Sequence, residues 1–300
     1  MDRRVALDGG QSGCRARDAA GRIWEGVGVD TSRPRIPQLA AAVRAAAPEG
    51  AEHVLVGTTG LGVEDTAAAL LDELRDHGTQ SVHLAHDSVT SYLGALGDRT
   101  GCVVAAGTGV VTLAAGVTTA ARVDGWGWIL GDAGSGFWIG RRAIDMALRA
   151  YDGRGPATAL LDLVRADFGD PSLAYLTLQA DPHRVARTAA YAKQVDALAE
   201  TDEVAAQVLR DAASELVMSV TTALGRVDGG PDDPVCVLGN VFRSATLTEA
   251  FSERLGAVAA THPIVPAQGT GLDGADLLDQ LASGLARLVD VATVGTATRG

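Results

Sequence analysis

The sequence predicts an α/β protein made of two lobes, and two observations carry this prediction. The order β-β-β-α-β-α-β-α, which begins near residue 3, recurs in outline from residue 101 with a long helical stretch inserted. Each copy also opens with two short strands joined by a glycine-rich turn, at 9–13 in the first copy and 107–109 in the second. We assign residues 1–98 to an N-terminal lobe and 99–300 to a C-terminal lobe.

The elements of the first lobe follow from runs of apolar residues separated by turn residues. Short runs rich in Val, Leu and Ala between glycines indicate strands, whereas longer runs with apolar residues at three- and four-residue steps indicate helices. The predicted elements are strands 3–8, 14–19 and 22–29, a helix 36–47, a strand 53–56, a helix 64–77, a strand 81–85 and a helix that opens at Ser88.

The second lobe repeats this opening and then carries a helical insertion at about 136–226. Inside the insertion, Val204, Val208 and Leu216 belong to one apolar stripe at helical spacing, and Asp181-Pro182 is typical of a helix start. The other predicted elements are strands 101–106, 110–115 and 120–123, a strand 235–238, a helix 244–260, a strand 262–265 and a last helix 273–290. We expect the last helix to pack back on the N-terminal lobe.

The charge balance excludes two classes of partner. The chain has 37 acidic against 25 basic residues and a net charge of −12, whereas nucleic acids and anionic membranes require clustered positive charge. Residues 100–121 lack charge but are interrupted by Gly107-Thr108-Gly109, so two strands fit them better than a membrane span. No signal-peptide pattern follows Arg3 and Arg4. We expect a cytoplasmic protein that binds neither nucleic acid nor membrane.

The cysteines indicate no metal or redox chemistry. Cys14, Cys102 and Cys236 are far apart, each in or beside a predicted strand, and the sequence contains no CxxC pair. This pattern favours their interpretation as small, buried apolar residues of the core.

The two glycine-rich turns are candidate phosphate-binding elements. Glycine lets the backbone curl around a phosphate, which backbone N–H groups then bind without side-chain cations. Asp8, at the end of the first strand, is a candidate ligand for Mg²⁺. The candidate phosphate contacts are Gly9, Gly10, Gln11, Ser12 and Gly13 in the first turn and Gly107, Thr108 and Gly109 in the second. Each turn alone is also typical of an ordinary hairpin, and their matching positions in the two lobes favour the phosphate interpretation.

Asp87 is the candidate catalytic residue. His86-Asp87-Ser88 lies where a predicted strand ends and a helix begins. A carboxylate at this place can accept the proton of an attacking hydroxyl group. The alternative is that Asp87 or Ser88 only caps the helix, and the local sequence does not separate the two interpretations.

The run from residue 124 to 141 contains the most informative pattern in the chain. It reads Asp-Gly-Trp-Gly-Trp-Ile-Leu-Gly-Asp-Ala-Gly-Ser-Gly-Phe-Trp-Ile-Gly-Arg, and its glycines indicate tight turns and a close backbone approach. Core packing is the interpretation that we favour for Trp138. Asp132, which small residues flank, is better explained as a carboxylate that accepts hydrogen bonds from sugar hydroxyl groups.

A last glycine turn, Gly239-Asn240, follows the predicted strand 235–238 and precedes a helix. Ligands of α/β lobes bind at the carboxyl ends of such strands, so these residues are candidates for binding adenine or ribose. An ordinary connection between a strand and a helix is the alternative.

Taken in this order, the motifs resemble those of the BadF/BadG/BcrA/BcrD ATPase family and, within it, of the N-acetylglucosamine kinase branch. The resemblance covers nearly the whole chain, and its most specific part is the run from Gly125 to Gly140. It implies an α/β fold of two ribonuclease-H-like lobes, of the actin and hexokinase type, with a helical insertion in the second lobe.

The resemblance also implies a role for each motif. Asp8 would hold Mg²⁺, the two glycine turns would hold the phosphates of ATP, and Gly239 with Asn240 would bind the adenosine. Asp87 would act as the base on the sugar hydroxyl. The sugar-binding residues would be Thr108, Gly125, Trp126 and Asp132. The family has glycine at the positions that Gln11 and Asp124 occupy in this chain.

We therefore expect a kinase that uses ATP and Mg²⁺ to phosphorylate an amino sugar at its 6-hydroxyl group, with N-acetylglucosamine, N-acetylmuramic acid or glucosamine as the substrate. The resemblance also implies a homodimer. Two alternatives stay open on the same fold. An ATPase activator of a radical dehydratase needs cysteines that bind an iron–sulfur cluster, which the isolated cysteines disfavour. A non-catalytic sugar sensor needs neither Asp8 nor Asp87, and both are present.

Overall fold

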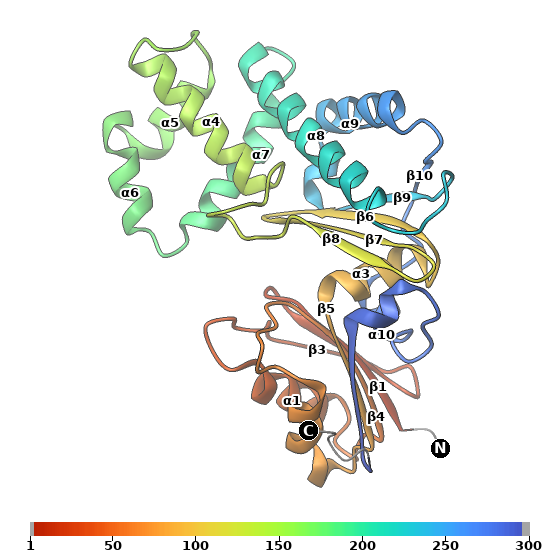
Figure 1. Cartoon of the computed structure of the whole chain (residues 1–300). Helices are drawn as coiled ribbons and strands as arrows, with labels where there is room; N and C mark the ends of the chain where they lie inside the picture. The colour runs from red at the N-terminus through yellow and green to blue at the C-terminus, as the bar shows by residue number, and fades with distance from the viewer. Residues whose placement is uncertain (1–2, 296–300) are drawn as a thin grey trace.

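The chain folds around two β-sheets that lie one above the other. The computed structural model describes residues 3–295. In Figure 1 the first sheet lies in the lower half of the molecule and the second sheet lies above it, with the helices α3 (Asp87–Leu96) and α10 (Gly271–Ala275) between them. The sequence prediction of a two-lobe α/β fold with a helical insertion in the second lobe is confirmed.

The first sheet has six strands in the order β11-β5-β4-β1-β2-β3. β1, β4 and β5 run parallel, so their carboxyl ends meet at one edge, and this edge carries Asp8 and His86. Helices α1 (Arg35–Ala46) and α2 (Ala67–Glu73) bury apolar side chains on one face. The strands are β1 (Arg4–Gly9), β2 (Cys14–Asp18), β3 (Ile23–Gly26), β4 (His53–Thr58), β5 (Ser81–His86) and β11 (Val289–Thr293).

The second sheet has five strands in the order β10-β9-β6-β7-β8. α8 (Glu203–Leu224) and α9 (Ala245–Val258) cover its outer face, as Figure 1 shows. Of the predicted apolar stripe, Val208 and Leu216 are buried on α8, and Val204 is partly buried against the same core. The strands are β6 (Gly101–Ala106), β7 (Val110–Ala115), β8 (Ala120–Val123), β9 (Val235–Leu238) and β10 (Ile264–Val265).

The insertion consists of helices that extend from one side of the second sheet (Figure 1). α4 and α7 pack closely, since a Cβ atom added to Gly140 of α4 would lie 1.8 Å from the Thr188 carbonyl oxygen of α7. The first residue of α4 is tied to the second sheet, because the N–H of Gly136 donates to the carbonyl of Gly107. The helices are α4 (Gly136–Tyr151), α5 (Leu160–Phe168), α6 (Ala174–Ala180), α7 (Arg184–Leu198) and α8.

A shared apolar cluster joins the two sheets. It contains Leu55 of β4, Leu93 of α3 and Leu113 of β7, each almost completely buried. α3 therefore packs against both sheets, so the residues at its N-terminus have a fixed place between the lobes.

The predicted helix 273–290 is wrong. The segment forms the short helix α10, a 3-10 turn (Gly284–Leu288) and the strand β11. The strand forms because Val289, Val291 and Thr293 have high β propensity and find an open edge on β5, with which they pair antiparallel. The chain thus returns to the first sheet as a strand rather than as a long helix.

Among residues 3–295, none of the helices combines the length and the apolar character that a membrane span requires.

Candidate functional site

The first glycine turn joins β1 to β2 and forms one wall of a hollow of about 410 Å³. The turn is closed by the N–H of Gly10, which donates to the Gly13 carbonyl at 3.0 Å, and the N–H of Val29 donates to the Gly10 carbonyl at 2.9 Å. The hollow is lined by Asp8, Gly10, Ser12, Gly13, Cys14, Arg15, Glu25 and Gly26.

Gly9 and Gln11 were predicted to contact phosphate, but neither lines the hollow. Gly9 is buried, and its carbonyl accepts hydrogen bonds from the Thr58 hydroxyl and the Thr59 N–H, so it serves the packing of β1 on β4. Gln11 is exposed at the tip of the turn and does not line the hollow.

Asp8 is a partly buried acid beside a second acid. Burial, and then the negative charge of Asp87, raise its pKa from 3.8 to about 6, while Arg15 and a hydrogen bond with the Thr90 side chain oppose the shift. Thr90 belongs to α3 and can approach because β4 has glycine at position 57, where a Cβ atom would lie 2.3 Å from Thr90. The sequence therefore places a helix of the lobe interface directly against the acid.

The C-terminal segment also reaches Asp8. A Cβ atom added to Gly271, the first residue of α10, would lie 2.7 Å from the Asp8 carboxylate. Only glycine fits there without displacing the acid. Two segments far apart in the sequence thus meet at this carboxylate, which the sequence did not indicate.

Asp87 is the first residue of α3. The alternative interpretation was that Asp87 or Ser88 only caps this helix, but the capping residue is the neighbouring His86. The ring of His86 accepts the hydrogen bond of the Ser88 N–H at 3.2 Å, which makes His86 the N-cap. The His86 Nδ1 atom also lies 2.8 Å from an Asp87 carboxylate oxygen. The Asp87 side chain is 31% exposed, so a ligand can reach it.

The second glycine turn, between β6 and β7, is held by the start of α4. The Gly136 N–H donates to the Gly107 carbonyl at 2.8 Å, and the Phe137 N–H donates to the Thr108 carbonyl at 3.1 Å. The first N–H groups of α4 therefore fix the turn, and the Thr108 side chain is left exposed.

A cavity of about 570 Å³ opens beside this turn. Gly107, Thr108 and Asn240 line it, so the structure brings together residues that the sequence predicted to bind phosphate and adenosine. Gly239 allows this convergence, because its φ is 98° and a Cβ atom there would lie 2.2 Å from the Ala106 carbonyl oxygen. One wall of the cavity is α7, which contributes Lys193 and Asp196. Sequence analysis missed both residues.

The loop between β8 and α4 is held by the carboxylates of Asp124 and Asp132. Both residues have a φ of 58°, which non-glycine residues seldom adopt. Asp124 accepts hydrogen bonds from the N–H groups of Asp132 and Ala133 at 2.8 and 2.9 Å. The side chain thus ties the beginning of the loop to its end.

Asp132 is buried against the second glycine turn. A Cβ atom added to Gly109 would lie 2.6 Å from its carboxylate, which accepts hydrogen bonds from the N–H groups of Gly127 and Val110. Burial, and then the charge of Asp124, raise its pKa. With 7% of its surface exposed, Asp132 joins the predicted sugar loop to the predicted phosphate turn.

Trp126 and its neighbours form an exposed apolar rim on this loop. Trp126 is 65% exposed and lies under the Arg122 guanidinium, whose carbon is 5.6 Å from the ring centre. Ile129 and Leu130 are also exposed, and Trp128 lies beneath the Arg184 guanidinium. Trp138, in contrast, packs against the core, as the sequence suggested.

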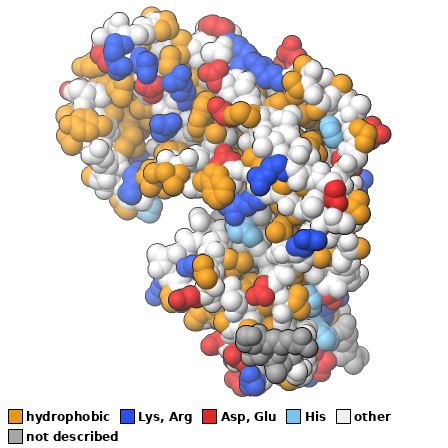
Figure 2. Space-filling model, viewed as in Figure 1, with side chains coloured by type: hydrophobic (Ala, Val, Ile, Leu, Met, Phe, Trp, Pro, Cys, Tyr) orange, Lys and Arg blue, Asp and Glu red, His pale blue; other side chains and the backbone are white. Residues whose placement is uncertain are grey.

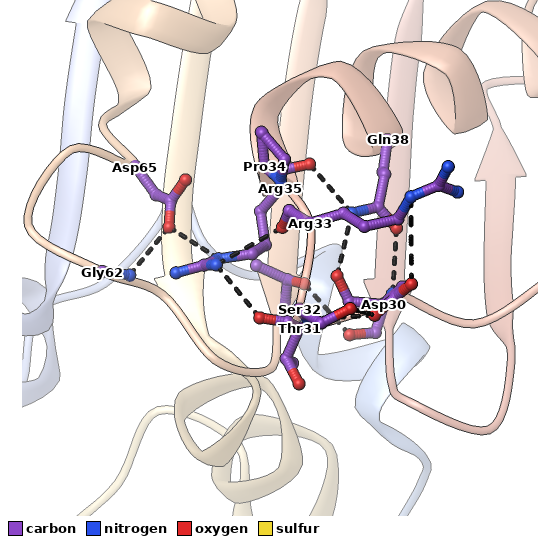
Figure 3. A network of polar contacts seen from close by, with 11 residues as sticks. Asp30, Thr31, Ser32, Arg33, Pro34, Arg35, Gln38, Gly62 and Asp65 are labelled. Carbon is purple, nitrogen blue, oxygen red and sulfur yellow. Dashed lines mark hydrogen bonds and ion pairs between the residues drawn. The ribbon is translucent and has the colours of Figure 1, made fainter.

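A polar network fixes two loops of the first lobe (Figure 3). The Arg35 guanidinium donates to Asp65 at 2.8 Å and to the Thr31 carbonyl at 3.3 Å, and the Gly62 N–H donates to Asp65 at 2.7 Å. The loop before α1 is thereby joined to the loop after β4. Sequence analysis missed this network, because its partners are thirty residues apart and match no motif.

The site residues therefore form three groups. Asp8 and Asp87 lie together at the edge of the first sheet, Asp132 lies against Gly109, and Asn240 shares a cavity with Gly107 and Thr108. Figure 2 shows the surface hollowed between the upper and lower halves of the molecule, with hydrophobic and basic side chains along its upper edge. Within the described part of the chain, no three His, Cys, Asp or Glu side chains gather as a metal cluster.

Comparisons with known proteins agree on a family. The model of the BadF/BadG/BcrA/BcrD ATPase family matches residues 19–278. A relative from Clostridium acetobutylicum, named N-acetylmuramic acid/N-acetylglucosamine kinase, is 29% identical over 179 residues, which are 57% of this chain. The match spans 58% of that relative, less than two thirds of its length.

Solved structures resemble most of the chain. A protein from Chromobacterium violaceum, described as a candidate N-acetylglucosamine kinase, has a TM-score of 0.73 and 26% identity, over 93% of this chain and 99% of its own. A Porphyromonas gingivalis protein with the same description has a TM-score of 0.68 at 17% identity over 93% of this chain and 99% of its own. The ROK hexokinase of Thermus thermophilus shares the fold, with a TM-score of 0.55 and 16% identity over 92% of this chain and 97% of its own.

Proposed function

The chain belongs to the BadF/BadG/BcrA/BcrD ATPase family, and from this premise we propose that it is an ATP-dependent kinase that phosphorylates an amino sugar. The single observation that carries the proposal is the pair of acids Asp8 and Asp87, which lie close together beside a glycine turn that borders a hollow. A phosphoryl transfer needs a carboxylate for the metal and another for the hydroxyl proton, next to a place for the phosphates.

The donor set suits Mg²⁺. Carboxylate oxygens are the ligands that Mg²⁺ prefers, and nucleotide-bound Mg²⁺ commonly uses only one or two of them, with phosphates and waters completing its shell. Asp8 would hold the ion, since burial and then the negative charge of Asp87 raise the pKa of this carboxyl and a bound cation would favour its ionised form. When bound, the ion supplies positive charge that neutralises the phosphates.

Asp87 is the proposed general base. It would accept the proton of the sugar 6-hydroxyl group as the hydroxyl oxygen bonds to the γ-phosphorus and the bond to the β-phosphate oxygen breaks. The backbone N–H groups of Ser12 and Gly13 in the first turn, and of Thr108 and Gly109 in the second, would position the phosphates, so that catalysis comes mainly from positioning and charge.

The loop 124–132 is the proposed sugar-binding element. Gly125 and Trp126 are at its accessible end, and the exposed Trp126 ring offers an apolar face to a sugar ring. Asp132 already accepts two backbone hydrogen bonds. It therefore supports the loop, and its remaining acceptor positions are the ones that a sugar hydroxyl would use.

N-acetylglucosamine is the substrate that we propose first. The kinase names of the relatives from C. acetobutylicum and C. violaceum both contain this sugar, which supports an amino sugar over glucose. N-acetylmuramic acid and glucosamine are the next candidates. Activation of a radical dehydratase finds no support, because Cys14, Cys102 and Cys236 are all buried.

A coupled assay of ADP release over a panel of sugars tests the proposal. The panel contains N-acetylglucosamine, N-acetylmuramic acid, glucosamine, N-acetylmannosamine and glucose, each with ATP and Mg²⁺. We expect release to depend on one or more of the amino sugars and to stop when EDTA removes the metal. ADP release that is the same with and without every sugar would overturn the kinase proposal and leave an ATPase.

A further inference from the structure

The cavity beside the second glycine turn has a wall that the motifs do not explain. α7 contributes alanines together with Lys193 and Asp196, opposite Asn240 and Arg243 of the turn that follows β9. The cavity is continuous with Gly107 and Thr108, so a ligand whose phosphates lie on the turn extends into it. We ask which part of a nucleotide this wall suits.

The cavity-facing residues of α7 form one stripe. Ala186, Ala189, Lys193 and Asp196 recur at three- and four-residue steps, which places them on one face of the helix. The opposite face is the structural one, because Thr188, Tyr191 and Val195 are buried there. Lys193 and Asp196 are therefore not needed to anchor the helix.

Both polar side chains of the stripe are available to a ligand. Among residues 3–295, no hydrogen bond or ion pair engages the side chain of Lys193 or of Asp196, although they are one turn apart. Lys193 is exposed and Asp196 is half-buried. A cation and an anion that line one cavity without pairing can each bind a separate group of a bound molecule.

The order along α7 gives the direction of that molecule. A Cβ atom on Gly136, which is bonded to the phosphate turn, would lie 3.6 Å from the Ala189 side chain. At about 1.5 Å per residue, Lys193 lies roughly 6 Å and Asp196 roughly 10 Å further along the helix axis. This span is comparable to the length of a nucleoside.

We propose that the nucleoside of ATP lies along α7, with the ammonium of Lys193 donating to the ribose and α-phosphate oxygens and the carboxylate of Asp196 accepting a hydrogen bond from the exocyclic amine of the base. The alanines offer a flat apolar surface to the ring. Asp196 thereby selects adenine over guanine, since guanine carries a carbonyl oxygen where adenine carries the amine. This inference rests on the proposed use of ATP and names the residues that recognise it.

Lys193 allows a direct test of this inference, because it is the only lysine in the chain. The others among the 25 Lys and Arg residues are arginines. An amine-acylating reagent followed by peptide mass spectrometry reports the accessibility of this one side chain. We expect saturating ATP with Mg²⁺ to protect Lys193 at least about fivefold, and the sugar alone to give no protection. Acylation of the α-amino group in the same sample controls for reagent strength.

Substitution of Asp196 tests base selection. We expect Asp196→Asn to lower kcat/KM for ATP about 10- to 100-fold, the range for a hydrogen bond to a charged group, and to leave or raise the value for GTP. The amide can turn its N–H₂ toward the guanine carbonyl. Asp162→Asn is the matched control, since Asp162 is an exposed acid of the same insertion, and it should change neither value.

The outcomes separate this inference from the kinase proposal. If a sugar is phosphorylated but ATP fails to protect Lys193 and Asp196→Asn keeps the ATP-to-GTP ratio, the inference is overturned and the kinase stands. If no sugar is phosphorylated but ATP protects Lys193, the nucleotide site stands and the kinase proposal falls. Circular dichroism of each variant confirms that the insertion is folded.

Discussion

Asp8 and Asp87 are negative charges held near each other by two strands and a helix, with the Thr90 side chain bonded to Asp8 and the His86 Nδ1 atom 2.8 Å from Asp87. The fold gains little from this arrangement, since burial of the first acid next to the second is unfavourable. At these two residues, the arrangement that the proposed reaction needs therefore lowers the stability of the fold.

Asp8→Asn should make the chain more stable while it removes activity. An acid whose pKa rises from 3.8 to about 6 on folding binds its proton more tightly when folded, so its ionisation destabilises the fold as pH rises from about 4 to 6. The variant removes a cost on the order of 1–3 kcal/mol above pH 6. Urea unfolding in EDTA at pH 7.5 and at pH 4 measures the difference. A gain that is equal at both pH values would contradict this origin.

Asp124 offers a second residue-scale prediction. Glycine would relieve the positive φ, worth about 1 kcal/mol, but would lose two hydrogen bonds to backbone N–H groups, each worth about 1–2 kcal/mol. We expect Asp124→Gly to lower the Tm and to raise the KM for the sugar. Asp124→Asn keeps an acceptor and should retain most of both. A Tm that rises in the glycine variant would show that backbone strain dominates.

At the residue scale, the sequence predicted which residues form motifs, but it did not predict which residues surround them. Asp87 was placed correctly at the start of a helix, but which residue caps the helix depended on the rotamer of His86. The burial of Asp132 depends on Gly109, which is distant in sequence and contributes only by lacking a side chain. Contacts of this kind are made by tertiary packing, and no local pattern encodes them.

Among the elements, α3 and α10 are the pair on which the site depends. They approach closely at two glycines: a Cβ atom on Gly94 would lie 1.9 Å from the Thr270 carbonyl oxygen, and one on Gly274 would lie 1.9 Å from the Thr90 carbonyl oxygen. The N-terminus of α10 also has a capping box between Thr270 and Asp273. These contacts hold Gly271 against Asp8.

Gly94→Ala should therefore destabilise the fold and displace α10 from the site. The added methyl group meets backbone, which cannot move aside cheaply, so we expect a loss of about 1–3 kcal/mol and a lower kcat/KM. Gly256→Ala in α9 is the matched control, because nothing lies within 4 Å of its Cβ position and alanine favours a helix by up to about 1 kcal/mol. Thermal unfolding of the two variants should shift in opposite directions. A neutral Gly94→Ala would show that the two helices are not tightly packed.

The positions of helices and strands could be predicted where turn residues flank them in the sequence. β6, β7, β8 and β9 begin and end where the sequence analysis placed them, because glycine or proline lies next to the apolar runs of β6, β7 and β9. The predicted helix 273–290 failed because its residues also suit a strand, and an open edge of β5 decided the outcome. The α7 wall of the cavity was missed because it becomes a wall only after α4 packs on it.

For the whole molecule, two sheets joined by one apolar cluster explain how a site can lie between them. Leu55, Leu93 and Leu113 bring both sheets onto α3, which carries Asp87 at its N-terminus. The repeated strand order predicted this architecture from the sequence. The relative placement of the two glycine turns follows from the packing of α3, which sequence patterns do not describe.

The most direct test of the central claim is ³¹P NMR of a mixture of ATP, Mg²⁺ and N-acetylglucosamine with the wild-type chain and with Asp87→Asn. We predict that the wild type forms a sugar 6-phosphate resonance in step with ADP, whereas the variant still binds ATP by calorimetry and forms at least about 10²-fold less. Sugar phosphate formed by the variant at the wild-type rate, or inorganic phosphate as the only product of the wild type, would contradict the account.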